Sequence, residues 1–413
     1  RKQSTMENPF WLLPRLRELL PYRSLPFGPE EPPARSSSPL QHVTIELRNA
    51  LSGDTVSNVE LRQSDTVDKL RNMAARELKQ PLSYIQLLSG HRLLSMNETL
   101  NEAGLGNGSV VNVIRRPCFL VTSSADFTAK LWDTVSGECF RTFAGHTGKV
   151  NSATPSPDNQ YILTSSEDGT AKLWCTETGD CILTVESGHG QVLSAAVSPD
   201  GTMIAAGTYD GVAQVWSIPS GEKKLTIHEV ESMPVRKVDF SPDGRSILTA
   251  SGDCGTARVW DVESGENTLL LCGSLEDIIL SARYSPDGRS IVTGRCDDTV
   301  QAWNAESGEL ILQLEGHDGA VYAAEFSPSG KHILTGSSDC TAKIWNARSA
   351  QCIRTLEGHR GEVFSVSFAP DGGLLATGSM DSTARIWACR GGVCKVILEG
   401  HTGAVLSVDF SRA

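Results

Sequence analysis

The 413-residue sequence has no run of eighteen successive apolar residues, and its cysteines form no C-x-x-C pair. The first absence predicts that no helix spans a membrane, because a spanning helix needs about 20 apolar residues. The second argues against a zinc site, whose ligands recur at such spacings. No nucleophile motif or phosphate-binding loop stands out either. We therefore expect a soluble protein without a cofactor, in a reducing compartment: cytoplasmic, or alternatively nuclear.

Basic residues are scarce in most of the chain. Residues 1–117 hold 15 Lys and Arg and 12 Asp and Glu, which leaves 22 of the 37 basic and 37 of the 49 acidic residues for 118–413. The larger part is therefore acidic. Binding to a phosphate backbone requires clustered Lys and Arg, so we expect other proteins or peptides as partners, and no nucleic acid.

Seven of the eight Trp recur at a nearly constant distance. With Trp11 set aside, successive spacings are 42, 42, 44, 43, 42 and 42 residues, for Trp132, Trp174, Trp216, Trp260, Trp303, Trp345 and Trp387. A fixed period of this length indicates a repeat architecture.

Each repeat has the same internal pattern, which residues 235–265 illustrate. The alternating stretch "VRKVDF" precedes the turn "SPDG", the run "SILTA", a second turn, the run "TARVW" and the turn "SG". Pro and Gly supply the backbone angles that such turns need. Four short strands in each repeat are typical of a propeller blade, whereas helical repeats would show a period of 3.6 residues.

The recurring Gly-His dipeptide, the repeat Trp and the Asp of the second turn make residues 118–413 resemble the WD-repeat family. The resemblance implies a β-propeller whose blades each hold a hydrogen-bonded tetrad of His, Thr, Asp and Trp. Three sets fit this pattern: His146, Thr164, Asp168 and Trp174; His317, Thr335, Asp339 and Trp345; His359, Thr377, Asp381 and Trp387. A half-buried carboxylate needs donors of this kind.

Three departures from the pattern occur in the middle of the array. Ala206 replaces the Thr that precedes Asp210. Two other repeats lack the Gly-His step, because His228 is out of register and residues 271–277 contain no His. We expect these blades to be less rigid. A Thr–His–Asp group can also act as a nucleophile relay. Because an enzyme needs one such site and the group recurs here, a structural role is favoured.

The eleven Cys are an odd number, which argues against a disulfide framework. Four of them follow a repeat Trp by seven residues, namely Cys139, Cys181, Cys352 and Cys394. One structural position explains these four, and we expect buried thiols there.

The first 41 residues have a different composition. The segment "NPFWLLPRLRELL" (8–20) is apolar but is interrupted by Pro14, and residues 21–41 are rich in Pro and Ser. We expect a disordered or weakly helical tail and a linker. A helix that docks on a partner is the alternative for residues 8–20.

Residues 42–116 predict two strands, a helix that begins at a Ser/Asp cap near 64–65, and two further strands. The segments "SDTVDKL", "LLSGHRLL" and "TLNEAGLGNGSVVNVI" make this region resemble ubiquitin-like domains of the β-grasp fold. The segment ends in "NVIRRPCF" without a diglycine, and the chain continues. The domain is therefore expected to be recognised by partners and not conjugated to them. Leu87 and Leu88 are candidates for that contact, although either could belong to the core.

The last repeat of the sequence is incomplete. The phrase "GHTGAVLSVDFSRA" (400–413) supplies one inner strand, whereas the residues after Cys118 supply only three strands of a blade. We expect strand 404–410 to close blade one of a seven-bladed propeller, so that His401 joins Thr122, Asp126 and Trp132.

The resulting fold class is mainly β, a seven-bladed WD-repeat β-propeller (118–413) after an α+β ubiquitin-like β-grasp domain (42–116). The resemblance implies a non-catalytic interaction scaffold, with the ubiquitin-like domain as a second docking module. An adaptor that recruits substrates to a ubiquitin ligase or to the proteasome is one alternative, in which the ubiquitin-like domain docks on ubiquitin-receptor or proteasome components. A propeller-type hydrolase is another, but it would need acidic clusters in the central channel, and the sequence indicates only the Asp of the repeat turns.

The resemblance to WD-repeat propellers implies partner contacts near the start of each inner strand and just before each turn Asp. The residues near the strand starts are Asn151, Leu193, Arg236, Leu280, Tyr322, Phe364 and Leu406. Among both groups, Tyr209, Arg236, Tyr322 and Phe364 are the strongest candidates, because aromatic residues and Arg dominate binding energy at protein interfaces.

Overall fold

The computed structural model describes residues 42–50, 52–78, 85–90, 92–95, 98–115, 118–229, 233–251, 255–272 and 278–412. The expected tail and linker (1–41), the turn carboxylate Asp253 and most of the His-free segment 271–277 lie outside the described residues. Within the described ranges, no helix is long and apolar enough to cross a bilayer.

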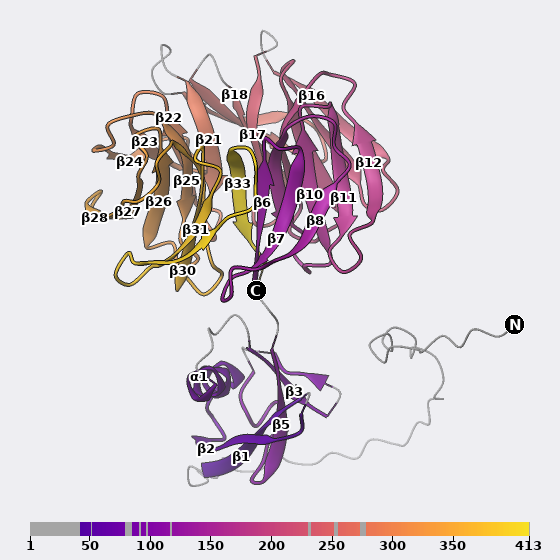
Figure 1. The fold of residues 1–413 in the computed structure, drawn as a ribbon, viewed down its shortest axis with the longest axis vertical. Helices are drawn as coiled ribbons and strands as arrows, with labels where there is room; N and C mark the ends of the chain where they lie inside the picture. Colours follow the sequence, from indigo (N-terminus) through magenta and orange to yellow (C-terminus); the bar gives the residue numbers. More distant parts are fainter. Residues whose placement is uncertain are drawn as a thin grey trace, which may run out of the picture. The chain divides into compact units, whose positions relative to one another are not determined.

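Residues 42–115 form a five-stranded mixed sheet and one helix (Figure 1). The sheet order is β2-β1-β5-β3-β4, with β1 parallel to β5 and the other pairs antiparallel. The elements are β1 (His42–Asn49), β2 (Thr55–Arg62), α1 (Val67–Glu77), β3 (Ile85–Ser89), β4 (Arg92–Leu93) and β5 (Ser109–Arg115). This arrangement is the predicted β-grasp.

The helix begins one residue later than its expected cap. Thr66 is the N-cap, and its side chain accepts a hydrogen bond from the Lys69 amide. Asp65, one of the expected cap residues, accepts hydrogen bonds from the Arg62 amide and from Lys69 Nζ. A Thr oxygen satisfies an unpaired amide of the first turn as Ser or Asp would.

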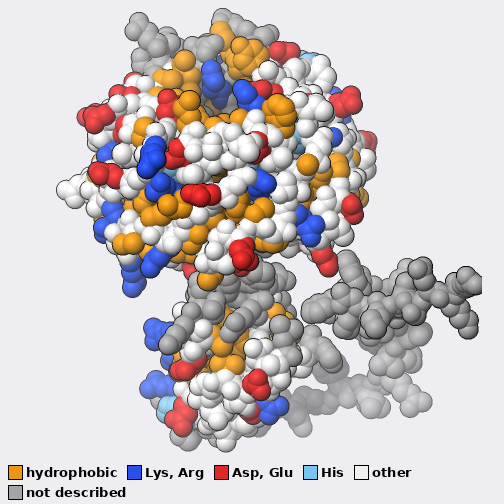
Figure 2. Space-filling view, viewed as in Figure 1, with side chains coloured by type: hydrophobic (Ala, Val, Ile, Leu, Met, Phe, Trp, Pro, Cys, Tyr) orange, Lys and Arg blue, Asp and Glu red, His pale blue; other side chains and the backbone are white. Residues whose placement is uncertain are grey.

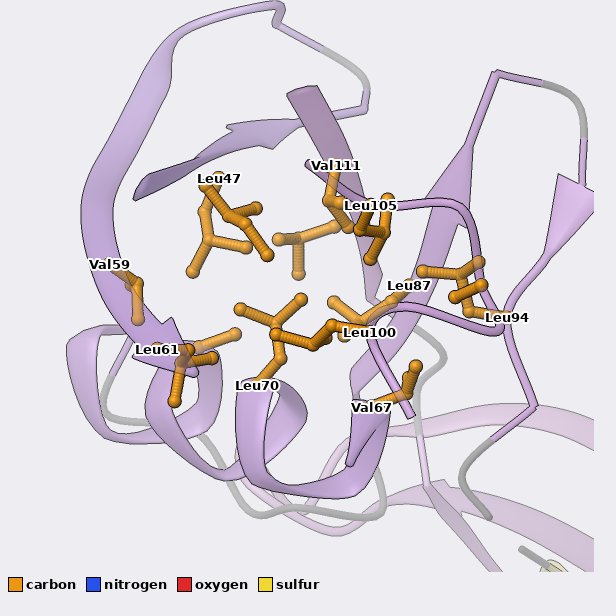
Figure 3. Packing of buried hydrophobic residues seen from close by; sticks show 14 of the residues in the cluster. Leu47, Val59, Leu61, Val67, Leu70, Leu87, Leu94, Leu100, Leu105 and Val111 are labelled. Carbon is orange, nitrogen blue, oxygen red and sulfur yellow. The ribbon is translucent and has the colours of Figure 1, made fainter. Parts of the chain in front are cut away.

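Leu87 lies in the apolar core between the helix and the sheet. Figure 3 shows Leu87 packed among Leu70, Leu94 and Leu100, and it is 0% exposed. The expectation that Leu87 contacts a partner is therefore wrong, because a partner could reach it only by opening the core. Leu88 points to the other face of β3 and is half-buried, as the alternation of side chains along a strand requires.

Residues 118–412 form seven four-stranded antiparallel sheets, which we number as blades 1 to 7. Blade 1 combines β33 (Val405–Phe410), β6 (Phe119–Ser124), β7 (Thr128–Asp133) and β8 (Cys139–Ala144). Blade 2 holds β9 (Val150–Pro155), β10 (Tyr161–Ser166), β11 (Thr170–Cys175) and β12 (Cys181–Glu186). Blade 3 holds β13 (Val192–Val197), β14 (Met203–Thr208), β15 (Val212–Ser217) and β16 (Lys223–His228).

The other four blades repeat this order from inner to outer strand. Blade 4 holds β17 (Val235–Phe240), β18 (Ser246–Ser251), β19 (Thr256–Asp261) and β20 (Asn267–Cys272). Blade 5 holds β21 (Ile279–Tyr284), β22 (Ser290–Arg295), β23 (Val300–Asn304) and β24 (Leu310–Leu314). Blade 6 holds β25 (Val321–Phe326), β26 (His332–Ser337), β27 (Ala342–Asn346) and β28 (Cys352–Leu356). Blade 7 holds β29 (Val363–Phe368), β30 (Leu374–Ser379), β31 (Ala384–Ala388) and β32 (Cys394–Leu398).

The inner strands close a ring that lines a central channel. Each inner strand contacts the inner strand of the next blade, and β33 contacts both β29 and β9. The apolar cores lie between neighbouring blades: Trp174 of blade 2, for example, packs with Val121 and Phe143 of blade 1. Each blade is therefore buried against two neighbours, which no isolated blade could achieve.

Every inner strand carries a β-bulge at its second residue. In blade 4, Val235 pairs with Ser251 and Lys237 pairs with Ala250, so Arg236 has no opposite residue. The same register shift omits the second residue in the other six blades. A bulge re-aims the side chain of the extra residue.

Candidate functional site

Among the described residues, four blades hold a complete tetrad. In blade 2, His146 Nδ1 lies 2.7 Å from Asp168 Oδ2, His146 Nε2 lies 2.7 Å from Thr164 Oγ1, and Trp174 Nε1 donates to the same oxygen over 2.8 Å. A neutral imidazole that donates from Nδ1 and accepts at Nε2 satisfies all three partners. The sets of His317 and of His359 have equivalent contacts.

The tetrad of blade 1 joins residues from opposite ends of the propeller sequence. His401 Nε2 lies 2.7 Å from Thr122 Oγ1 and its Nδ1 lies 2.7 Å from Asp126 Oδ2, while Trp132 Nε1 donates to Thr122. Strand β33 pairs with β6 along its length, from Val405 opposite Ser124 to Phe410 opposite Leu120. The last described strand therefore completes the first blade.

Burial and hydrogen bonding set the charges of these groups. Burial lowers the pKa of His146, which favours the neutral ring. Burial alone would raise the pKa of Asp168, but hydrogen bonds from Thr170 and His146 lower it to about 2. Asp339 shows the same balance, with a pKa of about 2. In these protonation states, the neutral His and the ionised Asp join the strands of a blade through their hydrogen bonds.

Blade 4 replaces the histidine by a glutamate, which the sequence analysis missed. The Glu229 side chain is fully buried; it accepts a 2.5 Å hydrogen bond from Thr249 Oγ1 and forms an ion pair with Arg258. Trp260 Nε1 donates to Thr249 over 2.8 Å, as in the other blades. The 44-residue spacing between Trp216 and Trp260 was the available signal, because it indicates two extra residues in this repeat.

Within the described residues, blades 3 and 5 show only parts of the network. Ala206 has no hydroxyl group to offer Trp216, and His189 instead meets His228 edge to face, with ring centroids 6.2 Å apart. In blade 5, Trp303 Nε1 donates to Thr293 over 3.0 Å, and the fully buried Arg295 donates to Gln301. The reduced rigidity expected of the two blades without the Gly-His step, blades 4 and 5, stays a prediction.

The seven bulged residues are the ones predicted near the starts of the inner strands. They are Asn151, Leu193, Arg236, Leu280, Tyr322, Phe364 and Leu406. All lie at the amino ends of the inner strands, around one end of the channel. The bulge frees each of them from pairing across the sheet.

Two of the four strongest candidates lie in contact. The Tyr322 and Phe364 rings meet edge to face with centroids 5.2 Å apart, and both residues are half-buried. Burial and a hydrogen bond to Glu362 raise the pKa of Tyr322 to about 12. Tyr209 is 56% exposed at the turn between β14 and β15, and no ring contact within the described residues joins it to this pair. Arg236 is half-buried, and its Nε has no hydrogen-bond partner in the part of the chain that the structure describes.

The other end of the channel is charged, contrary to expectation. Asp239, Glu325 and Asp409 line it from three inner strands, and none occupies a repeat-turn position. Each accepts hydrogen bonds from a neighbouring blade: Asp239 from the Tyr284 amide, Glu325 from Arg283 and the Phe368 amide, and Asp409 from Thr154 and Ser367. The sequence indicated only turn carboxylates because the repeat pattern does not show which inner-strand residues face the channel.

The prediction that the four cysteines of the outer strands are buried is wrong. Cys139, Cys181 and Cys352 are exposed and Cys394 is half-buried, and all ten described Cys are free thiols. Outer strands carry bulges too, and the omitted residues include the exposed Phe140, Ile182, Ile311 and Ile353. Figure 2 shows hydrophobic side chains in small groups among charged ones on the visible surface. Bulges and charges of this kind protect exposed sheet edges from pairing.

Four-stranded blades, shared tetrads and a closed inner ring define a β-propeller of the WD-repeat class. A comparison with family models agrees: the description "WD domain, G-beta repeat" matches residues 137–175, 179–217, 222–261, 265–304, 308–346 and 350–388. The chain belongs to this family. Each matched sequence repeat begins at the outer strand of one blade and ends at the third strand of the next blade. The remaining four strands make up the seventh repeat. Two of them, β32 and β33, lie at the end of the propeller sequence, and the other two, β6 and β7, lie at its start.

The match to a curated relative covers a single repeat length. The nuclear distribution protein PAC1 of Arthroderma otae is 44% identical over 43 residues, which is 10% of this chain and 9% of that protein. The chain therefore spans about a tenth of the length of this relative, and the likeness covers the repeat alone.

Proposed function

We propose that the chain is a non-catalytic scaffold that binds a protein or peptide at the end of the channel ringed by the seven bulged residues. The contact between Tyr322 and Phe364 carries this proposal. Two aromatic rings, held half-exposed by bulges on adjacent inner strands, offer a rigid apolar anchor of the kind that dominates interface energies. Met380, 57% exposed in blade 7, adds adaptable apolar surface.

Membership of the WD-repeat family supports the same role, because its members generally act as interaction scaffolds. The Thr–His–Asp groups recur in four blades as structural ties. The channel carboxylates, which could have favoured a hydrolase, each bond to a neighbouring blade. We assign them to the joints between blades.

Affinity capture with the whole chain tests the proposal. We expect Tyr322→Ala together with Phe364→Ala to remove the captured partners, because the pair supplies the central contact. Phe140→Ala is the matched control, since Phe140 is an exposed aromatic residue on an outer strand. An unchanged set of partners in the double variant would contradict the proposal.

We further propose that the β-grasp domain is a second docking module, which is the arrangement an adaptor of a ubiquitin ligase or proteasome pathway would use. Leu88 supports this, because it lies on the face of β3 opposite the core and is half-buried. Leu88→Ser, tested in the same capture experiment, should lose ubiquitin-receptor or proteasome components and keep the partners of the propeller. Leu87→Ser is unsuitable, since it would place a hydroxyl in the core.

A further inference from the structure

The charged end of the channel contains a cavity of about 570 Å³. Its walls are the carboxyl-terminal halves of the inner strands, and its rim includes the turn prolines of six blades: Pro157, Pro199, Pro242, Pro286, Pro328 and Pro370. The bulged residues lie at the amino ends of the same strands, so this cavity is separate from the proposed protein-binding end. A volume of this size suits a small molecule.

Lys237 occupies a position where other blades use a serine to join their neighbours. In four blades, the third residue of the inner strand accepts a hydrogen bond from an amide of the next blade: Ser407 from Ala153, Ser152 from Ala195, Ser194 from Val238, and Ser365 from Val408. Lys237 is the third residue of β17 and cannot accept such a bond, because an ammonium group has no acceptor. The lysine therefore weakens the joint that a serine would make.

Among the described residues, no group forms a hydrogen bond or a direct ion pair with the Lys237 ammonium, although Lys237 lines the cavity. The carboxylates of Asp239, Asp409 and Glu325 attract it without such a contact. Burial and the nearby positive charge of Arg283 lower the pKa of Lys237 to about 8, against the opposing effect of these carboxylates. The repulsion between the two cations favours a further anion between them.

Several N–H donors of the Arg283 guanidinium group have no partner among the described residues. One Nη group donates to Glu325 over 3.0 Å, and that is its single ion pair within the described residues. A guanidinium group carries five N–H donors, and the Arg283 side chain is 23% exposed toward the cavity that it lines. The three carboxylates nearby, in contrast, already accept bonds from neighbouring blades.

We propose that this cavity binds a small molecule through an oxyanion, a phosphate or a carboxylate, held between Lys237 and Arg283. The ammonium and the free guanidinium N–H groups donate to the oxyanion, and such charge-assisted bonds are roughly twice as strong as neutral ones. The carboxylates keep the walls of the site in place. This inference is independent of the protein-binding proposal, because it concerns the opposite end of the inner strands.

Isothermal titration calorimetry of the whole chain tests the inference, with inorganic phosphate and citrate as probes at constant ionic strength. We expect saturable binding of at least one probe, and the comparison of the two distinguishes a phosphate from a carboxylate site. Lys237→Ser should weaken binding by roughly ten- to a hundredfold, the loss expected for one bond to a charged group. Lys331→Met is the matched control, since Lys331 is an exposed lysine next to β26.

Lys237→Ser also separates binding from folding, because it restores the serine of the other blades. We expect its melting temperature to equal or exceed that of the wild type. Absence of saturable binding for both probes, or equal binding by Lys237→Ser, would overturn the proposal. A lower melting temperature for Lys237→Ser would do the same, because it would show that the lysine serves the fold.

Discussion

Glu229 takes in blade 4 the place that histidine takes in blades 1, 2, 6 and 7. It lies 20 residues before its threonine, whereas His146 lies 18 residues before Thr164. The two extra residues let a carboxylate reach the same hydroxyl, and Arg258 supplies the positive charge that a buried carboxylate needs. The first position of the tetrad can therefore hold either a neutral histidine or a glutamate that is paired with an arginine.

We predict that Glu229→Gln lowers the free energy of unfolding by about 3–5 kcal/mol, because it leaves Arg258 charged, poorly exposed and unpaired. Urea denaturation measures this change. Glu263→Gln, at an exposed glutamate of the same blade, should have little effect. The double change Glu229→Gln with Arg258→Gln should cost less than the single one. Equal stability of Glu229→Gln and the wild type would show that the pair is not structural.

The sequence predicted residues where a repeat fixed their position and failed where it did not. Thr, Asp and Trp recur at fixed spacings, and the structure brings together the four tetrads named in advance. Glu229 was not predicted, because an insertion places it outside the spacing that the repeat His residues share. Leu87 and Leu88 are adjacent leucines, and only the pairing of β3 with β5 determines which one faces the core.

At the scale of the element, the repeated bulge is the feature that the sequence did not reveal. The starts of the inner strands were predicted, yet alternating residues do not show that one is omitted from pairing. The bulge turns side chains such as Tyr322 and Phe364 away from regular pairing. Because all seven inner strands carry this bulge, one end of the channel is surrounded by seven side chains that are free to contact a partner.

The blades with tetrads should lose stability in mild acid. Burial lowers the pKa of their four histidines, His146, His317, His359 and His401. Below pH about 6.5, the unfolded chain therefore binds protons more readily than the folded chain. The stabilising contribution is complete above that pH and is lost as the pH falls through the lower folded-state values. We predict a declining free energy of unfolding from pH 7 to pH 5.

Urea denaturation at pH 7.5, 6.5 and 5.5 measures this decline. Replacing His359 with Gln should reduce the slope by at most about 1.4 kcal/mol per pH unit, the value for one proton. The same change at His332, a half-buried residue of β26 outside the tetrads, is the control. A slope that is unaffected by His359→Gln would contradict this origin of the pH dependence.

At the scale of the whole molecule, counting strands was enough to predict seven blades and their closure. Three strands after Cys118 and one near the last described residue add up to a complete sheet only if they pair. A sheet edge left open would expose unpaired backbone groups. The position of β33 beside β9 and β29 follows from the same requirement.

Deletion of residues 400–413 should therefore destabilise the propeller far more than loss of an ordinary tail. It removes the inner strand of blade 1, the His401 contacts and the apolar packing of Val405, Val408 and Phe410. We expect a large fall in melting temperature, with aggregation through β6. Thermal denaturation followed by circular dichroism measures it, and an unchanged melting curve would refute the closure.

The divided repeat also sets an order of events during synthesis. Thr122 and His401 are 279 residues apart, and a ribosome adds about 5–20 residues each second. Strand β6 therefore waits roughly a quarter of a minute to a minute for β33, while blades 2 to 7 are completed. The blade that emerges first is finished last, so the speed of translation determines how long a nascent chain carries an unpaired strand.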